Sequence, residues 1–251
     1  MKEKCVIYNI EILTDCFCKI GDGKPEIRGT SIRGMIREWT RLLGGNPDNV
    51  WGGKGGNAGK VGIAISNVNS EKSDSFLMPH KGGNKPSAIE AGATFELVLS
   101  RLVGCTDQMW YEAKKNVENW LLLGCLGQRA NRAAGSVWNS DWNYKSKKDF
   151  LAKSPTNCVL LSNEGFDDPE KVRTIASDTV AGHPEIFGDI KRKDDYGSKR
   201  KSSPIKMKVI EIDEKFHLLL FAKQMDILTK AVKLVKYDRP DNENWSKVSF
   251  E

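Results

Sequence analysis

The sequence lacks the features of a membrane protein or a secreted protein. No stretch approaches the ~20 apolar residues that a membrane-spanning helix needs, and the start, Met1 to Cys5, has no apolar core of a signal peptide. We therefore expect a cytoplasmic protein without a membrane partner. Of its 251 residues, 39% are hydrophobic and 29% are charged, a balance typical of a soluble chain that folds.

Histidine is scarce and the cysteines are scattered. The three histidines, His80, His183 and His217, are each alone in the sequence, so a local metal or triad signature is absent. The six cysteines include no Cys-x-x-Cys pair, and no nearby histidine completes a zinc site. We expect reduced, mostly buried thiols, no metal and no other cofactor.

A nucleotide-binding loop is also missing, although the glycine-rich stretch from Gly55 to Val61 invites that assignment. Its spacing fails, because Lys54 stands five residues before Gly59, and Val61 replaces the hydroxyl residue that magnesium requires. We expect a loop whose Lys54 and Lys60 contact phosphates without forming an ATP site.

Positive charge is in modest excess. The formal net charge is +6 and the isoelectric point is about 8.9, which favours a polyanionic partner. An excess of this size is common among other proteins. The distribution of the charge must therefore decide whether the partner is a polyanion.

The first 150 residues follow the order β-α-β-β-α-β. Alternating apolar residues predict a strand over 4–14, and an amphipathic pattern predicts a helix that Thr30 or Ser31 caps and Gly44-Gly45 ends. Further strands are expected at 61–65, 93–103 and 136–138, and a second helix at 106–123. This order predicts a ferredoxin-like unit.

Residues 151–251 repeat that order less clearly. The expected elements are a strand at 158–162, a helix at 168–180, a hairpin at 204–212 and 215–222, a helix at 225–236 and a last strand at 245–250. Both halves place a similar tripeptide after their first helix, Val50-Trp51-Gly52 and Ile186-Phe187-Gly188, which is weak evidence of duplication. The expected fold class is α+β, with tandem ferredoxin-like (RRM-like) βαββαβ domains at 1–150 and 151–251.

Arginines recur at every fourth residue of the first predicted helix, and one more lies just upstream. They are Arg33, Arg37, Arg41 and Arg28. Such a stripe can follow a phosphate backbone, and the capping residues leave free backbone N–H groups at the same end of the helix. The alternative is a solvated helix face whose arginines pair with Glu26 and Glu38.

A glycine-containing loop runs from Gly124 to Ser136 and carries Arg129 and Arg132. Glycines permit close backbone approach, so the loop suits a clamp on an RNA backbone. An ordinary surface loop between helix and strand is the equal alternative.

The most basic segment is 191–201, which contains Tyr196 and ends in Lys199, Arg200 and Lys201. It is expected to become ordered on RNA, with Tyr196 stacking on a base, or else to be a solvated hairpin-like loop.

The run from Pro25 to Trp39, PEIRGTSIRGMIREW, resembles the signature of the RAMP superfamily (repeat-associated mysterious proteins), especially the first-numbered, capping subunits of the type III-B Cmr effector complex. Further resemblances follow in the family's order: Val50-Trp51-Gly52, residues 88–97, residues 124–137, Ile186-Phe187-Gly188 and residues 199–205.

This resemblance implies a non-catalytic, RNA-binding structural subunit of a type III CRISPR RNA-guided effector, which caps the 3′-end region of the guide in antiviral defence. The implied partners are CRISPR guide RNA, target RNA, other RAMP subunits and a large Cas-ten-type subunit. The motifs and the resemblance together give the residues expected to contact RNA: Arg28, Ser31, Arg33, Arg37, Arg41, Lys54, Lys60, Arg129, Arg132, Ser136, Lys199, Arg200 and Lys201.

Two departures from the family pattern stand out. The family usually has Arg-Gly-Phe-Gly-Ser in the glycine-rich loop, but this chain has Arg132-Ala133-Ala134-Gly135-Ser136, which loses a glycine and an aromatic. The chain is also short for a first-numbered subunit, so a sixth-numbered Cmr subunit or a divergent capping subunit stays open.

A RAMP endoribonuclease that cuts target RNA or processes guide RNA is the main alternative function. Related subunits cut with an aspartate in the loop after the first strand, where this chain has Asp15 and Asp22. No metal cluster or general base accompanies either aspartate in the sequence. An RNA-binding or protein-assembly module outside CRISPR is the third interpretation.

Overall fold

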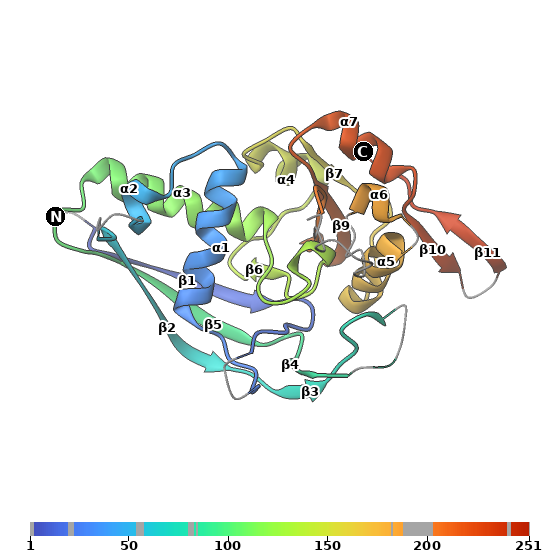
Figure 1. Ribbon diagram of the computed structural model, residues 1–251, viewed down its shortest axis with the longest axis horizontal. Helices are drawn as coiled ribbons and strands as arrows, with labels where there is room; N and C mark the ends of the chain where they lie inside the picture. Colours follow the sequence, from blue (N-terminus) through green and yellow to red (C-terminus); the bar gives the residue numbers. More distant parts are fainter. Residues whose placement is uncertain are drawn as a thin grey trace, which may run out of the picture.

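The first half of the chain folds into a four-stranded antiparallel sheet with two helices on one face (Figure 1). The computed structural model describes residues 3–19, 23–53, 58–79, 83, 85–181, 183–187, 203–239 and 242–250. The elements of this sheet and its helices are β1 (Cys5–Ile12), α1 (Gly29–Leu42), β2 (Val61–Asn69), β5 (Thr94–Arg101), α3 (Asp107–Leu123) and β6 (Val137–Asn139). The strand order β2-β5-β1-β6 is that of a ferredoxin-like unit, which confirms the prediction for this half.

Apolar periodicity accounts for these elements. Alternate residues of β1, among them Ile10 and Ile12, are buried beneath the helices. Helix α1 buries Ile32, Ile36 and Trp39 on one face. Helix α3 begins where the Thr106 side chain accepts a hydrogen bond from the backbone N–H of Met109 at 3.2 Å, and it packs beside α1.

The second half repeats the topology around a smaller sheet. Its elements are β7 (Val159–Leu161), α5 (Pro169–Ala181), α6 (Pro184–Phe187), β8 (Lys206–Ile212), β9 (Lys215–Phe221) and α7 (Met225–Val232). The strand order β7-β9-β8 corresponds to three of the four strands in the first sheet. Asp213 and Glu214, both with positive φ, make the two-residue turn that joins β8 to β9.

The expected last strand at 245–250 divides between two partners. Its first half, 245–247, falls in β11 (Asn242–Lys247), which pairs with β10 (Lys236–Arg239) as a separate hairpin. Only a single bridge, between Phe250 and Ser162, continues the second sheet beyond β7. The predicted strand therefore exists, but it is not the fourth strand of a complete ferredoxin-like sheet.

Several short elements were not predicted from the sequence. They include α2 (Asp48–Trp51), the paired strands β3 (Lys72–Asp74) and β4 (Ser87–Ile89), α4 (Lys147–Lys153), α6 and β10 (Lys236–Arg239). Helices α2 and α6 occupy equivalent places in the two halves, and each ends on a buried aromatic residue, Trp51 and Phe187. This correspondence supports duplication. The predicted boundary between 150 and 151 lies inside α4.

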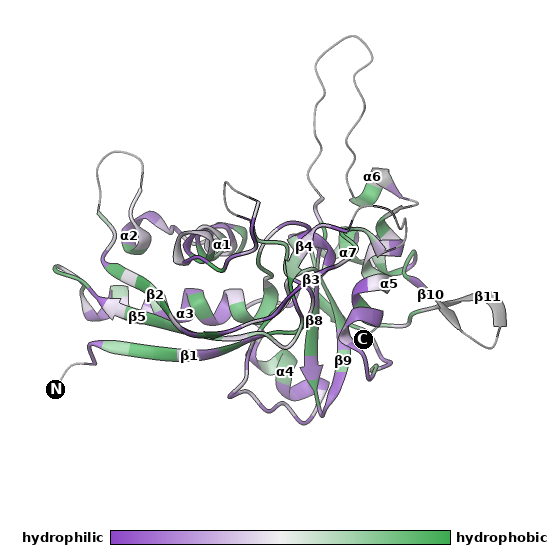
Figure 2. Cartoon of the chain, turned by 90° about the horizontal axis from the view of Figure 1, so that it is seen from below, coloured by the Kyte–Doolittle hydropathy of each residue, from purple (hydrophilic) through white to green (hydrophobic). Residues whose placement is uncertain are grey.

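The two halves share one hydrophobic core. The rings of Trp39 on α1 and Phe221 on β9 lie 5.0 Å apart, and one cluster of buried residues runs through both sheets. Figure 2 shows β8 and β9 running across the direction of β1, β2 and β5. None of the described helices has the length and apolar character needed to span a membrane.

Candidate nucleic-acid interface

The glycine-rich loop between α3 and β6 is closed on itself by backbone pairing. Cys125 and Ser136 form a bridge, and the Leu126 N–H donates to the Gly135 carbonyl at 2.7 Å. Gly127 has φ of +87°, and a Cβ there would lie 2.9 Å from the Phe17 carbonyl oxygen. Glycine is required at this point because the residue is left-handed and the backbone after β1 approaches it closely.

Two buried hydroxyls fix the far side of the loop. The Thr14 hydroxyl donates to the Ala133 carbonyl at 2.6 Å and accepts from the Ser136 N–H at 3.0 Å. The Ser136 hydroxyl donates to the same carbonyl at 2.9 Å and accepts from the Val209 N–H at 2.9 Å. Ser136 is completely buried, so its prediction as an RNA contact is wrong. It anchors the loop from inside.

The position that loses the family's glycine is occupied by a left-handed alanine. Ala133 has φ of +61°, a conformation that costs an L-residue about 1–2 kcal/mol. Its N–H donates to the Met207 carbonyl at 3.1 Å, and its own carbonyl accepts from both hydroxyls described above. Hydrogen bonds to other parts of the chain thus stabilise a left-handed conformation at Ala133 that glycine would adopt without strain.

A short 3₁₀ turn, η2 (Ala130–Arg132), presents the two arginines of the loop. Burial and the nearby charge of Arg129 lower the pKa of Arg132 to about 10. No carboxylate among the described residues forms a salt bridge with Arg132. Two neighbouring guanidinium groups, one of them half-buried, form a site at which an anion would relieve charge repulsion.

Lys206 on β8 adds a third cation and connects the loop to α1. Its Nζ donates to Asn131 Oδ1 at 2.7 Å and lies 3.1 Å from Glu38 Oε1. Lys206 and Asn131 were not among the predicted contacts, and only the lysines of the Lys206-Met207-Lys208 alternation could have drawn attention to them. The arginines of the loop, α1 and the second half therefore meet on one surface.

Helix α1 begins earlier than predicted. Arg28 is its N-cap residue and no side chain caps it, so the prediction that Thr30 or Ser31 is the cap is wrong. The exposed Arg28 guanidinium donates to the Lys19 carbonyl at 3.3 Å. Ser31 remains partly exposed in the first turn. Arg28 and Ser31 therefore lie where the helix N-terminus favours an anion.

Arg37 and Arg41 are held by α2. Arg37 donates to the Gly52 carbonyl and, at 2.6 Å, to Asp48, and Arg41 lies 3.4 Å from the same carboxylate. Their ion-pair partner is Asp48 and not Glu26 or Glu38. The pairing expected in the solvated-face alternative is therefore wrong for these two arginines. The Arg37 side chain is 20% exposed and holds the turn after α1, which makes it a structural residue. Arg41, at 55%, stays largely open to solvent.

The other predicted contacts are dispersed. Arg33 is half-buried, with its Nε atom lacking a hydrogen-bond partner within the described structure. Lys60 lies just before β2, which pairs with the end of β5 away from the glycine-rich loop, so roughly 25 Å of strand separates the two. The remaining predicted residues lie outside the described residues: Lys54, Lys199, Arg200 and Lys201, as do Tyr196 and Asp22.

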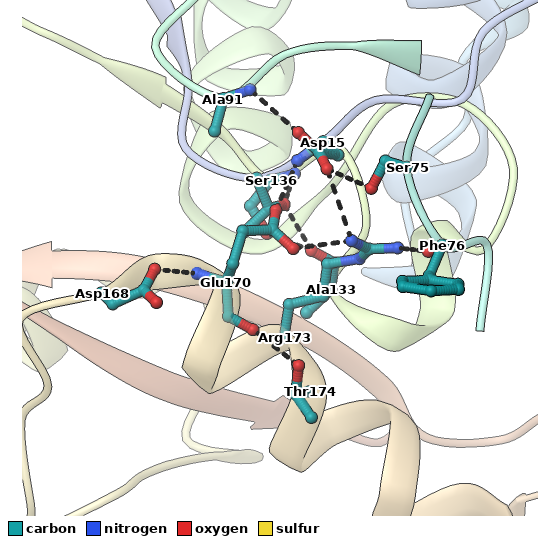
Figure 3. A network of polar contacts seen from close by, with 11 residues as sticks. Asp15, Ser75, Phe76, Ala91, Ala133, Ser136, Asp168, Glu170, Arg173 and Thr174 are labelled. Atoms are coloured by element: carbon teal, nitrogen blue, oxygen red, sulfur yellow. Dashed lines mark hydrogen bonds and ion pairs between the residues drawn. The ribbon is translucent and has the colours of Figure 1, made fainter. Parts of the chain in front are cut away.

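Asp15 forms part of a buried network between the two halves (Figure 3). Its carboxylate accepts from the Ser75 hydroxyl and from the Ala91 N–H at 3.1 Å, and it lies 3.8 Å from Nη1 of Arg173. The Asp15 N–H donates to Glu170 at 2.7 Å. No pattern in the sequence indicated that Asp15 contacts Glu170 and Arg173. All of these contacts are structural, and they leave Asp15 poorly placed to act on a substrate.

Arg173 is the centre of this network. Its side chain is 2% exposed, pairs with Glu170 at 2.6 Å, donates to the Phe76 carbonyl and lies over the Phe17 ring at 5.1 Å from the ring centroid. Burial is the main cause that raises the pKa of Glu170, and Arg173 opposes it. Within the described ranges, no three His, Cys, Asp or Glu side chains are grouped to hold a metal ion.

Comparison with known proteins identifies the relatives of this fold. The profile of the RAMP superfamily matches residues 9–138, which confirms the resemblance noted in the sequence. No curated protein gave a significant match. The matched segment contains the second half of β1, all of α1, the glycine-rich loop and most of β6.

Solved structures align over nearly the whole chain. Cmr1 from Pyrococcus furiosus in its apo form has a TM-score of 0.61 and 16% identity, over 88% of each chain. A chain of the Type III-B Cmr-beta bound to cognate target RNA has a TM-score of 0.62 and 12% identity, over 93% of this chain and 100% of that one. A chain of Cmr-beta bound to cognate target RNA and AMPPnP in the presence of ssDNA has a TM-score of 0.60 and 12% identity, over 93% and 98%. At identities this low, the TM-scores show a shared fold and nothing more.

Proposed function

The chain belongs to the RAMP superfamily, and we propose that it is an RNA-binding, non-catalytic subunit of a type III-B, Cmr-type CRISPR effector complex. In this role it caps the 3′-end region of the guide and touches guide and target RNA. Its partners are other RAMP subunits and a large Cas-ten-type subunit. The whole-chain likeness to Cmr1 and to chains of Cmr-beta bound to target RNA supports this assignment.

The observation that carries the proposal is the arginine pair on the glycine-rich loop. Arg129 and Arg132 repel each other, and burial already disfavours the charge of Arg132. A backbone phosphate at this point would offset their mutual repulsion and accept bidentate hydrogen bonds. The buried hydroxyls of Thr14 and Ser136 hold the turn, so binding requires little ordering of the loop.

Such contacts provide affinity without reading bases. Phosphates are the same in every sequence, so arginines on a fixed turn position the RNA, while base pairing between guide and target supplies sequence specificity. Arg28 and Ser31 at the N-terminus of α1, together with exposed Arg41, extend the proposed surface along the helix. The proposed surface does not include Arg37, because its guanidinium already donates to Asp48 of α2 and to the Gly52 carbonyl.

The nuclease alternative receives no support from the site. Asp15 accepts hydrogen bonds from Ser75 and Ala91 and lies beside Arg173, and its side chain is only 15% exposed. An aspartate that acts as a general base needs access to the proton it removes. We therefore assign a structural role to Asp15.

The proposal is tested by removing the two charges of the loop. The Arg129→Gln/Arg132→Gln variant should bind guide RNA at least 100-fold more weakly, because two charge-assisted contacts are each worth about 1.5–3 kcal/mol. The slope of log affinity against log salt should flatten by roughly 1.4, or about 0.7 for each lost phosphate contact on a single strand. Fluorescence anisotropy at several salt concentrations measures both quantities.

A charge-matched control separates this site from general electrostatics. Lys148→Gln/Lys233→Gln removes the same net charge from exposed positions on α4 and at the end of α7. This control should keep the wild-type salt slope. A folded arginine variant that binds as tightly as the control would overturn the proposal.

A further inference from the structure

Two cysteine thiols lie against each other directly beneath the glycine-rich loop. The backbone after β1 is extended at Cys16 and Phe17, so Cys16 and Cys18 point to the same side and the Phe17 ring points to the other. The Cys16 Sγ donates to the Cys18 Sγ at 3.5 Å. Cys16 is fully buried, whereas Cys18 is 6% exposed. A small solute therefore has access to Cys18 first.

Their surroundings give the two thiols different chemistry. The hydrogen bond from Cys16 is the largest cause that lowers the pKa of Cys18, and the Glu26 N–H and the nearby Arg28 charge also favour the thiolate. The same hydrogen bond, followed by burial, raises the pKa of Cys16. Because the thiolate is the reactive form, Cys18 has the character of an attacking group and Cys16 that of a resolving group.

We propose that Cys16 and Cys18 form a redox-active dithiol that a peroxide converts into a disulfide. The Cys18 thiolate attacks one peroxide oxygen, the O–O bond breaks, and hydroxide leaves a sulfenic acid on Cys18. The Cys16 sulfur then attacks the Cys18 sulfur, the S–O bond breaks, and water leaves with the proton of Cys16. Two thiols are oxidised to one disulfide, and hydrogen peroxide is reduced to two waters.

The bond requires a local movement that the glycine-rich loop would feel. A disulfide has its sulfurs about 2.0 Å apart, so the two thiols must close by roughly 1.5 Å. Cys16 Sγ also lies 3.5 Å from the Leu126 carbonyl oxygen, and the Phe17 carbonyl between the cysteines accepts from the Gln128 N–H at 3.0 Å. Oxidation therefore displaces the strand on which the Arg129 and Arg132 turn rests.

The disulfide is tested first without RNA. Tryptic cleavage after Lys4 and Lys19 releases one peptide, residues 5–19, that contains Cys5, Cys16 and Cys18. In a Cys5→Ser background, alkylation of the reduced protein should add two groups to this peptide. After hydrogen peroxide it should add none, and the peptide should be two hydrogens lighter. The Cys5→Ser/Cys16→Ser control should instead yield a dimedone-reactive Cys18 without a disulfide.

Two alkylated thiols after peroxide, or a dimedone adduct that persists on Cys18 with Cys16 present, would overturn the dithiol. The effect on affinity rests on the proposed function: oxidation should weaken guide RNA binding about tenfold, equivalent to one charge-assisted contact, and a reductant should restore it. Unchanged affinity of the oxidised protein would overturn the coupling to the loop. Failure of the reduced protein to bind RNA would count against the proposed function, while the peptide masses would still decide the dithiol.

Discussion

Replacement of Arg173 with Met should be among the most destabilising single changes in the chain. The substitution keeps an unbranched apolar stem but removes a buried guanidinium that serves Glu170, Asp15 and the Phe76 carbonyl. It leaves two neighbouring carboxylates without their shared cation, since Asp15 already raises the pKa of Glu170. Removal of one partner of a buried ion pair costs about 3–5 kcal/mol, more than the pair itself contributes.

This cost should appear directly in unfolding experiments. For a chain of this size, a loss of about 3–5 kcal/mol lowers the melting temperature by roughly 6–20 °C. Urea unfolding of wild type and variant gives the free-energy difference. The loss of unfolding free energy should shrink at acidic pH, because protonation of Glu170, whose pKa is raised, removes its repulsion with Asp15.

Two further variants identify the cause. Arg173→Met/Glu170→Met removes the unpaired charge on the same helix and should recover part of the loss. Lys171→Met is the matched control. This exposed cation lies over the Phe166 ring at 5.3 Å from the ring centroid, and its loss should cost less than about 1 kcal/mol. If Arg173→Met costs no more than Lys171→Met, the network does not hold the two halves together.

Two other substitutions test the burial of Lys208 on β8 and the anchoring of the glycine-rich loop. Burial lowers the pKa of Lys208 to about 7, against 10.5 for a free lysine. The unfolded chain alone binds this proton between those values, so wild-type stability should rise with pH from about 7 to about 10, by up to ~1.4 kcal/mol per pH unit. Lys208→Met should lose that rise in urea unfolding, and an unchanged pH slope would contradict the burial argument. Thr14→Val removes a donor to the Ala133 carbonyl and an acceptor for the Ser136 N–H, and should cost about 1–3 kcal/mol in the same assay. Wild-type stability would show that the hydroxyl does not anchor the loop.

Periodicity and turn chemistry predicted most of the fold. The alternation in β1 and the amphipathic pattern of α1 and α3 are local signals, and each element lies within a few residues of its prediction. The β3–β4 pair was missed because three-residue strands carry almost no periodic signal. The pairing of the last predicted strand was not foreseen. β11 pairs with β10, and the local sequence does not encode which strand becomes a partner.

The site was less predictable than the fold. Arg129 and Arg132 were singled out because glycines and arginines stand close together in the sequence, and their contact with RNA stays a prediction. Arg37 and Ser136 were misjudged because their partners, Asp48 and Val209, come from elements whose packing the pattern does not reveal. Arg173 gave no signal at all, since a lone arginine in an amphipathic helix ordinarily faces solvent.

In the proposed function, RNA lies across the glycine-rich loop and the start of α1. Photo-crosslinking of a 4-thiouridine guide in the assembled complex, followed by peptide mass mapping, locates the RNA on this chain. We expect crosslinks concentrated in residues 127–134 and 28–34, with loss of the former in Arg129→Gln/Arg132→Gln. Guide RNA that is retained by the complex but crosslinks this chain only on the outer face of α3 or on α4 would contradict it.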